Sequence, residues 1–272
     1  MMLMWGVDRS SGIGGHSTEV SAEEFADGNW SDAQAAVPIT GKDPSWGSRT
    51  APVTVVIYSD YECPYCSKAE PTLAALREKY GPDKLRMVWK NFPLPMHRNA
   101  LPAHIAGQTI FELGGSKAFW KFHDLAFQNN RNLTPENFES WAEQAGVDRA
   151  KFKAAFAEQK GKAKVDEDVA GGQKVGVRGT PAFFINGIFI SGARPQDAFE
   201  AEIDKQIAEA KKLTAAGTPP DQIYVKLTNQ NKAKTPDAEK PPEEDDKTVW
   251  KVTVSKEEPF KGNAEALVTI VE

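Results

Sequence analysis

The sequence predicts an α/β fold in which a long helical block separates two parts that contain strands. Three observations predict it. A β-branched and aromatic run of strand length, residues 53–58, precedes a helical pattern and a second strand-like run at 84–92. Residues 98–176 then hold apolar residues mainly at helical spacing. Finally, Asn186-Gly187 lies between two short apolar runs and is the strongest two-residue signal for a β-hairpin.

Composition limits the classes of protein that fit. The chain has 272 residues, 40% of them hydrophobic, which is enough for one generous core or two small ones. Its net charge is -5 and its Lys and Arg residues are dispersed, so we expect no nucleic-acid partner. The apolar start at residues 1–6 is far shorter than the ~20 residues of a membrane helix and lacks the pattern of an export signal. Composition therefore leaves the cellular compartment open.

The first elements follow from local patterns. Residues 1–36 are polar, rich in Gly and Ser and without a sustained period, so we expect a loosely ordered arm. After the strand at 53–58, Leu73, Leu76 and Tyr80 recur at spacings of three and four, until Gly81 and Pro82 end the pattern. This pattern predicts a helix that begins beside the first cysteine of the chain.

The helical block divides at recognisable signals. Apolar residues over 98–127 predict a helix that is broken near Gly114-Gly115. Thr134, followed by a proline, is the expected N-cap of the next helix, and Asp148 is the expected cap of a third. Residues 161–175 predict one more helix.

The last part of the predicted domain contains the hairpin and a helix. Strands are expected at 182–185 and 188–191, and an amphipathic helix is expected from Pro195 to about Leu213. Residues 214–247 are Pro-rich and acidic and are interpreted as an exposed linker.

The two cysteines, Cys63 and Cys66, are the only ones in the chain. A disulfide scaffold uses more cysteines at wider spacing, because a short closed loop gains little stability. A structural zinc site needs about four ligands, and the four histidines of the chain form no close pair at metal-site spacing: His16, His97, His104 and His123. We therefore predict no metal, and redox chemistry is the interpretation that uses these two residues. Two inert buried cysteines are the alternative.

The position of the pair at a helix start gives that interpretation a physical basis. A thiolate is the nucleophile in disulfide exchange, and the unpaired amides of a helix N-terminus favour an anion. Cys63 is therefore the expected attacking sulfur, and Cys66, one turn along, closes onto it or resolves a mixed disulfide. Pro64 suits the first helical turn because it lacks an amide hydrogen. Tyr65 is expected to tune the reduction potential and to contact partners.

Three segments carry a resemblance to a known family. They are the CPYC motif after the first strand, NFPLPMHRNALPAHIA after the second, and GTPAFFING before the hairpin. With them, residues from about Pro52 to Leu213 resemble the DsbA-like thiol:disulfide oxidoreductases of the thioredoxin superfamily. The resemblance implies a thioredoxin-like fold over residues 37–213 with an inserted α-helical domain at about 98–176.

The resemblance also implies roles for residues away from the cysteines. Pro181 matches a cis-proline that lies beside the CxxC motif in thioredoxin-like proteins, and the backbone of Thr180 would then pair with an extended substrate. An ordinary trans-proline at the start of a strand is the alternative. Ile57 stands where many relatives carry a buried carboxylate that assists proton movement at the second sulfur. Asp60 and Glu62 lie closer to the motif, and solvated turn charge is their commoner role.

His97 follows the second strand on a Pro-rich loop. It is either a third participant in the chemistry or a structural histidine, and the structural role is favoured.

The function implied by the resemblance is disulfide exchange with cysteines of extended protein substrates. Oxidation is the favoured direction, in a periplasmic or other extracytoplasmic setting, because disulfides persist in oxidising compartments. No cofactor is implied, and a membrane redox partner would regenerate the site. A reductase or isomerase is the competing enzyme, and a redox-inert peptide-binding or chaperone module is the competing class.

The C-terminal sequence repeats the start of the predicted domain. Residues 252–272 align without gaps on residues 37–57, with seven identical pairs among twenty-one. We interpret residues 248–272 as the start of a second thioredoxin-like repeat. A lone edge strand, or a strand swapped between two chains, is the alternative.

Overall fold

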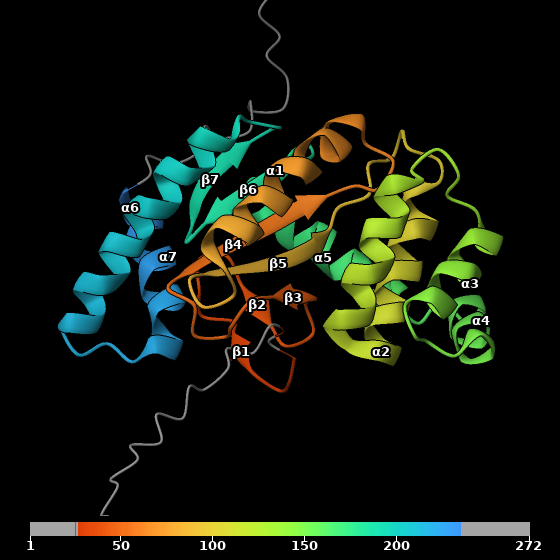
Figure 1. The fold of residues 1–272 in the computed structure, drawn as a ribbon, viewed down its shortest axis with the longest axis horizontal. Coiled ribbons are helices and arrows are strands. Elements are labelled where there is room, and N and C mark those ends of the chain that lie inside the picture. Colours follow the sequence, from red (N-terminus) through yellow and green to blue (C-terminus); the bar gives the residue numbers. More distant parts are fainter. Residues whose placement is uncertain (1–24, 26, 235–272) are drawn as a thin grey trace, which may run out of the picture. The chain divides into compact units, whose positions relative to one another are not determined.

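A five-stranded mixed sheet is the framework of the computed structural model, which describes residue 25 and residues 27–234 (Figure 1). The strand order is β3-β5-β4-β6-β7. Strands β4 and β5 are parallel, and the other neighbouring pairs are antiparallel. The bounds are β3 (Ser45–Trp46), β4 (Val53–Ser59), β5 (Leu85–Asn91), β6 (Ala182–Ile185) and β7 (Ile188–Ser191).

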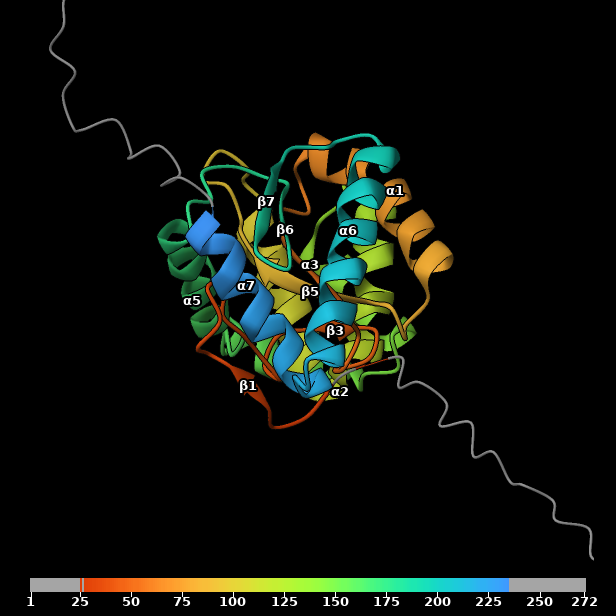
Figure 2. The same cartoon turned by 90° about the vertical axis from the view of Figure 1, so that its left-hand side faces the viewer.

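Side chains of β4 alternate between two hydrophobic cores, because successive residues of a strand point to opposite faces. Val55 and Ile57 belong to one core, and Val56 and Tyr58 belong to the other. Helices α1 (Pro64–Tyr80) and α6 (Gln196–Ala215) contribute to the first core, whereas α5 (Lys162–Lys174) and α7 (Ile223–Lys234) lie on the other side of the sheet (Figure 2). β4 is therefore buried on both faces, and its end is a firm base for a site.

The predicted hairpin is confirmed. Ile185 and Ile188 are paired, and the two turn residues between them, Asn186 and Gly187, both have positive φ angles of 44° and 91°. A turn with two positive φ angles matches the twist of the flanking strands. The side-chain oxygen of Asn186 also accepts a hydrogen bond from the Thr54 amide at 2.9 Å, which attaches the turn to β4.

The inserted helices have the predicted break and caps. α2 (Ala100–Gln128) is interrupted at Gly115, whose φ of 72° favours glycine, and the Ser116 amide beyond it donates to Asp27 at 2.9 Å. The Thr134 hydroxyl caps α3 (Pro135–Gln144), and the Asp148 carboxylate caps α4 (Arg149–Ala157). These three signals depend only on residues that are close in sequence, so the sequence alone predicted them.

Four buried charges attach the inserted helices to the sheet. Lys90 of β5 lies 2.7 Å from Asp43 and 3.3 Å from Asp168 of α5. Lys164 of α5 contacts the same two carboxylates, at 2.5 Å for Asp43. Burial raises the pKa of Asp43, but the two lysines outweigh it, and the pKa lies below its ordinary value. The two positive and two negative charges balance, so no buried charge is left without a counter-charge.

The predicted N-terminal arm, residues 1–36, is wrong for its last ten residues. β1 (Ser31–Asp32) pairs antiparallel with β2 (Ile39–Thr40), and the buried Asp32 accepts from Arg49 at 2.6 Å. The guanidinium of Arg49 also lies over the Trp30 ring. The segment is held by this two-residue strand pairing and by single side chains, not by a periodic apolar face, so the sequence pattern did not reveal it. Residues 1–24 and 26 lie outside the described part.

The predicted linker at 214–247 is also wrong over its first half. A 3-10 turn, η1 (Pro220–Gln222), leads into α7, so the prolines start a helix instead of extending a linker. Tyr224 is buried and its hydroxyl donates to the Val37 carbonyl at 2.6 Å. Residues 235–247 and the repeat at 248–272 lie outside the described residues, so both remain predictions.

Replacing Tyr224 tests whether α7 is part of the folded domain. Tyr224→Ala removes a buried ring and a buried hydrogen bond, and we expect the free energy of unfolding to fall by about 3 to 5 kcal/mol. Gln230→Ala changes an exposed residue of the same helix and is the control, with little effect expected. Chemical denaturation of both variants measures the difference, and equal stabilities would show that α7 does not pack on the domain.

Candidate functional site

Cys63 lies at the junction between β4 and α1. The strand ends at Ser59, a short turn follows, and Cys63 is the N-cap of the helix with an extended backbone conformation. Pro64 occupies the first turn, where a missing amide hydrogen costs nothing. The Cys63 carbonyl accepts from the Ser67 amide at 3.1 Å, as an N-cap carbonyl does. The sequence thus places the first sulfur at a helix N-terminus, as predicted.

The loop before β6 meets this helix end. The Thr180–Pro181 peptide bond is cis, and the Cys63 thiol donates to the Thr180 carbonyl at 3.6 Å. Pro181 is buried and Thr180 is half-buried. The structure therefore brings together the first and the third of the segments that the sequence singled out, although Cys63 and Thr180 lie 117 positions apart.

The pKa of Cys63 is lowered to about 5, from the usual value of 9.0. The hydrogen bond from the Cys66 thiol is the largest cause, and burial opposes it. A hydrogen bond from Thr180 and the backbone amides of Tyr65 and Cys66 lower the pKa further. The thiolate of Cys63 is thus stabilised by several donors at once, the arrangement that a helix N-terminus provides.

Cys66 has the opposite tendency. Burial raises its pKa well above the ordinary value, and its hydrogen bond to Cys63 acts in the same direction. Its sulfur also accepts from the Asp60 amide at 3.4 Å. Both cysteines are free in this structure. At neutral pH one sulfur is therefore a thiolate and the other a thiol, which is the division of labour that disulfide exchange needs.

Asp60 is not a solvated turn charge, as the sequence interpretation favoured, but a fully buried residue at 0% exposure. Its carboxylate accepts from the Glu62 amide at 2.8 Å and from the Leu94 amide at 2.7 Å. It also lies 2.8 Å from Nδ1 of His97. The partners Leu94 and His97 are distant in sequence, so only the position of Asp60 at a strand end signalled its role.

His97 is held on the loop between β5 and α2. Burial would lower its pKa, but the hydrogen bond and negative charge of Asp60 outweigh it, and the negative charges of Cys63 and Glu62 act in the same direction. The pKa of His97 is therefore raised. A second hydrogen bond, from the Asn99 amide to Glu62 at 2.6 Å, joins the same loop to the turn before Cys63.

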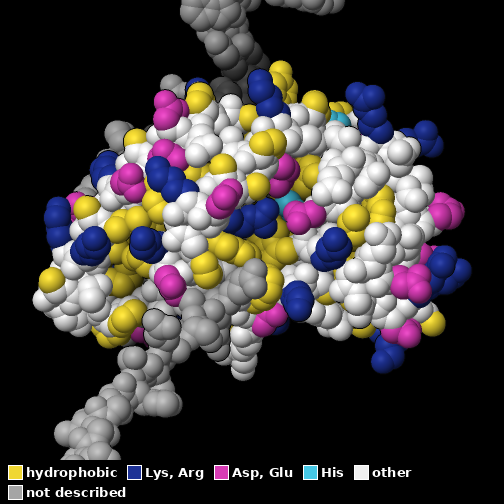
Figure 3. All heavy atoms as spheres, in the orientation of Figure 1, with side chains coloured by type: hydrophobic (Ala, Val, Ile, Leu, Met, Phe, Trp, Pro, Cys, Tyr) yellow, Lys and Arg dark blue, Asp and Glu magenta, His cyan; other side chains and the backbone are white. Residues whose placement is uncertain are grey.

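The rim of the site is partly apolar. Tyr65 is 64% exposed and Met96 is 74% exposed, on the two segments that Asp60 joins. Ile57 is buried in the core below the site, and its side chain offers no proton acceptor there. On the face shown in Figure 3, basic and acidic side chains are interspersed, so that face offers no extended surface of one charge.

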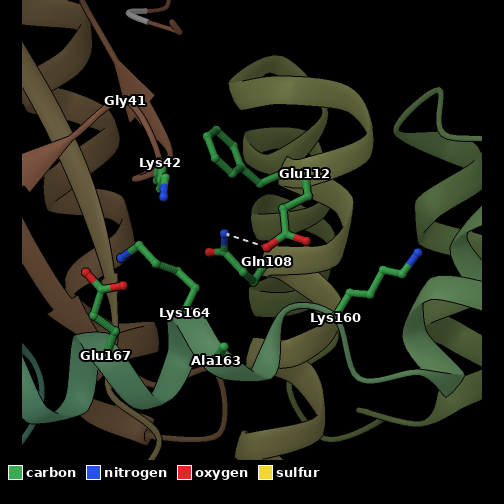
Figure 4. A pocket seen from close by; sticks show the side chains of 9 residues that line it. Gly41, Lys42, Gln108, Glu112, Lys160, Ala163, Lys164 and Glu167 are labelled. Atoms are coloured by element: carbon green, nitrogen blue, oxygen red, sulfur yellow. Dashed lines mark hydrogen bonds between the residues drawn. The ribbon is translucent and has the colours of Figure 1, made fainter. Parts of the chain in front are cut away.

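A pocket of about 430 Å³ lies elsewhere, between the β2–β3 turn, α2 and α5. Lys42 and Lys160 line it with Gln108 and Glu112, which are joined by a hydrogen bond of 3.4 Å (Figure 4). No residue of the cysteine site lines it. The described residues also contain no group of three or more His, Cys, Asp or Glu side chains that could hold a metal ion.

Sequence comparison places this geometry in a family. The model of the thioredoxin family matches residues 40–205. The chain belongs to the thioredoxin family. It is 31% identical over 177 residues to a probable disulfide bond formation protein D of Bacillus cereus, covering 60% of this chain and 78% of that protein. It is also 36% identical over 176 residues to a Na(+)/H(+) antiporter, NhaA 3, of Salinispora tropica, covering 64% of this chain but only 26% of the antiporter.

Solved structures show the same fold. BdbD from Bacillus subtilis, in its oxidised form, is 20% identical with a TM-score of 0.58, covering 67% of this chain and 98% of that one. A periplasmic thioredoxin-like protein from Salmonella enterica serovar Typhimurium is 25% identical with a TM-score of 0.54, covering 64% and 94%. The predicted thioredoxin-like fold with an inserted helical domain is thus confirmed. Among the described residues, no helix is long and apolar enough to span a membrane.

Two substitutions at position 66 test the origin of the low pKa of Cys63. Cys66→Ala removes the thiol that donates to Cys63, so the pKa of Cys63 should rise from about 5. Cys66→Ser keeps an O–H donor at the same place and should retain more of the lowering. The ultraviolet absorbance of the thiolate, followed against pH in the reduced protein, gives each value. Values that stay near about 5 in both variants would assign the low pKa to the helix terminus instead.

Proposed function

We propose that the protein is a thiol:disulfide oxidoreductase that oxidises cysteine pairs of other proteins. The observation that carries the proposal is the asymmetry of the pair, with the pKa of Cys63 lowered to about 5 and the pKa of the buried Cys66 raised. The likeness to a disulfide bond formation protein D supports the same activity. The likeness to antiporters covers about a quarter of those proteins and does not enter the proposal.

The reaction consists of two exchanges. A substrate thiolate attacks the sulfur of Cys63, the Cys63–Cys66 bond breaks, and Cys66 leaves and takes up a proton because its pKa is high. The second thiolate of the substrate then attacks its own sulfur in the mixed disulfide. Cys63 leaves as a thiolate, which its low pKa makes a good leaving group. The same low pKa favours oxidation over reduction, because it stabilises the reduced enzyme.

The loop at Thr180 and Pro181 is the proposed substrate-binding element. It lies within hydrogen-bond distance of Cys63, and an extended segment paired with its backbone would present a cysteine to that sulfur. The exposed ring of Tyr65 is the proposed contact for the flanking residues of the substrate. An extracytoplasmic setting, with a membrane redox partner that restores the disulfide, is part of the proposal, since substrates keep disulfides only in an oxidising compartment. The likeness to a periplasmic protein supports that setting.

Loss of the first cysteine tests the class of protein. We expect Cys63→Ser to reduce oxidation of a reduced, unfolded disulfide protein to the uncatalysed rate, because no mixed disulfide can form. Cys66→Ser, in contrast, should accumulate a mixed disulfide with a disulfide-bonded substrate, visible on a non-reducing gel. If Cys63→Ser still assists refolding as well as the wild type does, the protein is a binding or chaperone module.

The stability of the two redox forms tests the direction. Because the pKa of Cys63 is lower in the folded protein than the usual 9.0, its ionisation stabilises the folded reduced form fully above about pH 9 and not at all below about pH 5. The disulfide closes only a short loop and adds little. Urea denaturation at neutral pH should therefore show the reduced form to be the more stable. A more stable oxidised form, or a reduction potential near about -270 mV, would indicate a reductase.

A further inference from the structure

Oxidation of a substrate at this site produces one proton that the two cysteines do not absorb. The substrate loses two electrons and two protons when its thiols form a disulfide. The enzyme gains the two electrons as its own S–S bond breaks, and Cys66 binds one proton because burial raises its pKa. Cys63 remains a thiolate at neutral pH because its pKa is about 5. The second proton therefore goes to another group or to solvent.

His97 is the group whose position suits that proton. Its Nδ1 lies 2.8 Å from the buried Asp60 carboxylate, and its side chain is 20% exposed, so it can exchange protons with solvent. The carboxylate of Asp60 also accepts hydrogen bonds from the backbone amides of Glu62 and Leu94. These bonds hold the loop of His97 against the turn before Cys63. The amide of the same Asp60 donates to the sulfur of Cys66. One buried residue thus contacts both the histidine and the cysteine pair.

We propose that His97 is the proton-binding residue of the redox reaction and that Asp60 is the residue that positions it. When the disulfide is reduced, a negative charge appears on Cys63, and His97 takes up the released proton in response. When the disulfide is restored, that charge disappears and His97 returns the proton. The proposal rests on the proposed thiol-disulfide chemistry, but it concerns the proton and not the identity of the substrate.

The negative charges around His97 all favour its protonated form. The groups that face His97 are Asp60, Cys63 and Glu62, and each raises its pKa. Of these, only Cys63 changes charge with the redox state, so the change in proton binding reports on that sulfur. By thermodynamic linkage, the protonated His97 stabilises the Cys63 thiolate by the same free energy. Protonation of His97 should therefore favour the reduced enzyme, and the reduction potential should fall as pH rises through the pKa of His97.

The number of protons released on reduction of the disulfide tests the role of His97 directly. Reduction of the oxidised protein by dithiothreitol in weak buffer, with a pH indicator, counts the protons released per disulfide from about pH 6 to about pH 8.5, around the ordinary pKa of histidine. We expect His97→Asn to release about one proton near neutral pH, and less toward about pH 8.5, where the thiols of the reductant are themselves partly ionised. The wild type should release fewer protons per disulfide than His97→Asn over part of this range. Met96→Gln, on the same loop and exposed, is the control and should behave as the wild type.

Equal proton release by the wild type and His97→Asn at every pH would overturn the proposal. Dithiothreitol is a small dithiol that reduces the disulfide without a protein substrate. If the protein failed to oxidise other proteins, the proposed function would be contradicted. The proton measurement with dithiothreitol would still test the role of His97. Conversely, an active oxidase with equal proton release would contradict only the role of His97.

Nuclear magnetic resonance assigns the proton to a residue. The pKa of His97, followed through its ring carbon-bound protons, should be higher in the reduced protein than in the oxidised protein. Asp60→Asn keeps the size of the side chain but removes its charge, so it should lower the pKa of His97 in both forms. An identical pKa in the two redox forms would exclude His97 as the acceptor. An unchanged pKa in Asp60→Asn would exclude Asp60 as the residue that positions it.

Discussion

The hydrogen bond between the two sulfurs is the interaction on which the chemistry of the site depends. It is the largest cause of the low pKa of Cys63, and it also raises the pKa of Cys66. One contact therefore separates two chemically identical thiols into a thiolate and a thiol. It forms because the helix start places Cys63 at the N-cap and Cys66 one turn along, below the surface. The end of β4 in turn fixes the helix start, because β4 is buried on both faces.

The inserted helices are attached at the same end of the sheet. Asn91, the last residue of β5, donates from its backbone and its side chain to Asp168 of α5, at 3.1 and 2.9 Å. Its side-chain oxygen lies 2.9 Å from Nδ1 of His104 on α2. With the buried pairs of Lys90 and Lys164, these contacts fix both helices against β5. The loop that carries His97 runs from β5 to α2, so the network holds both ends of the loop that closes the site.

Local signals predicted more of this structure than distant contacts did. The Asn186-Gly187 turn, the break at Gly115 and the cap at Thr134 each depend on a few neighbouring residues, and each was predicted from sequence. Cys63 at a helix start was predicted in the same way, and the position of Pro181 came from family resemblance.

The failures have a common physical cause, which is packing between residues far apart in the chain. α7 is a weakly amphipathic helix that is fixed by contacts such as Tyr224 with the carbonyl of Val37, 187 residues away. Asp60 was interpreted as solvated because Ser59-Asp60 is the turn signal that ends the strand. Its burial depends on Leu94 and His97, which come from a loop more than thirty residues further on. No local pattern contains that information.

Ile57 and Asp60 together explain where a buried carboxylate can lie in this site. A carboxylate at position 57 would lie in an apolar core, where a charge needs a buried partner of opposite sign. The buried cations of the adjacent strand, Arg86 and Lys90, alternate with Met87 and Trp89 and therefore point to the other face of the sheet. There Lys90 pairs with Asp43 and Asp168, and Arg86 lies near Asp32. Asp60 lies three residues later, at the strand end, where backbone amides and a partly exposed histidine satisfy its oxygens. The buried carboxylate of this site thus lies at the strand end, beside the histidine that we propose as the proton-binding residue.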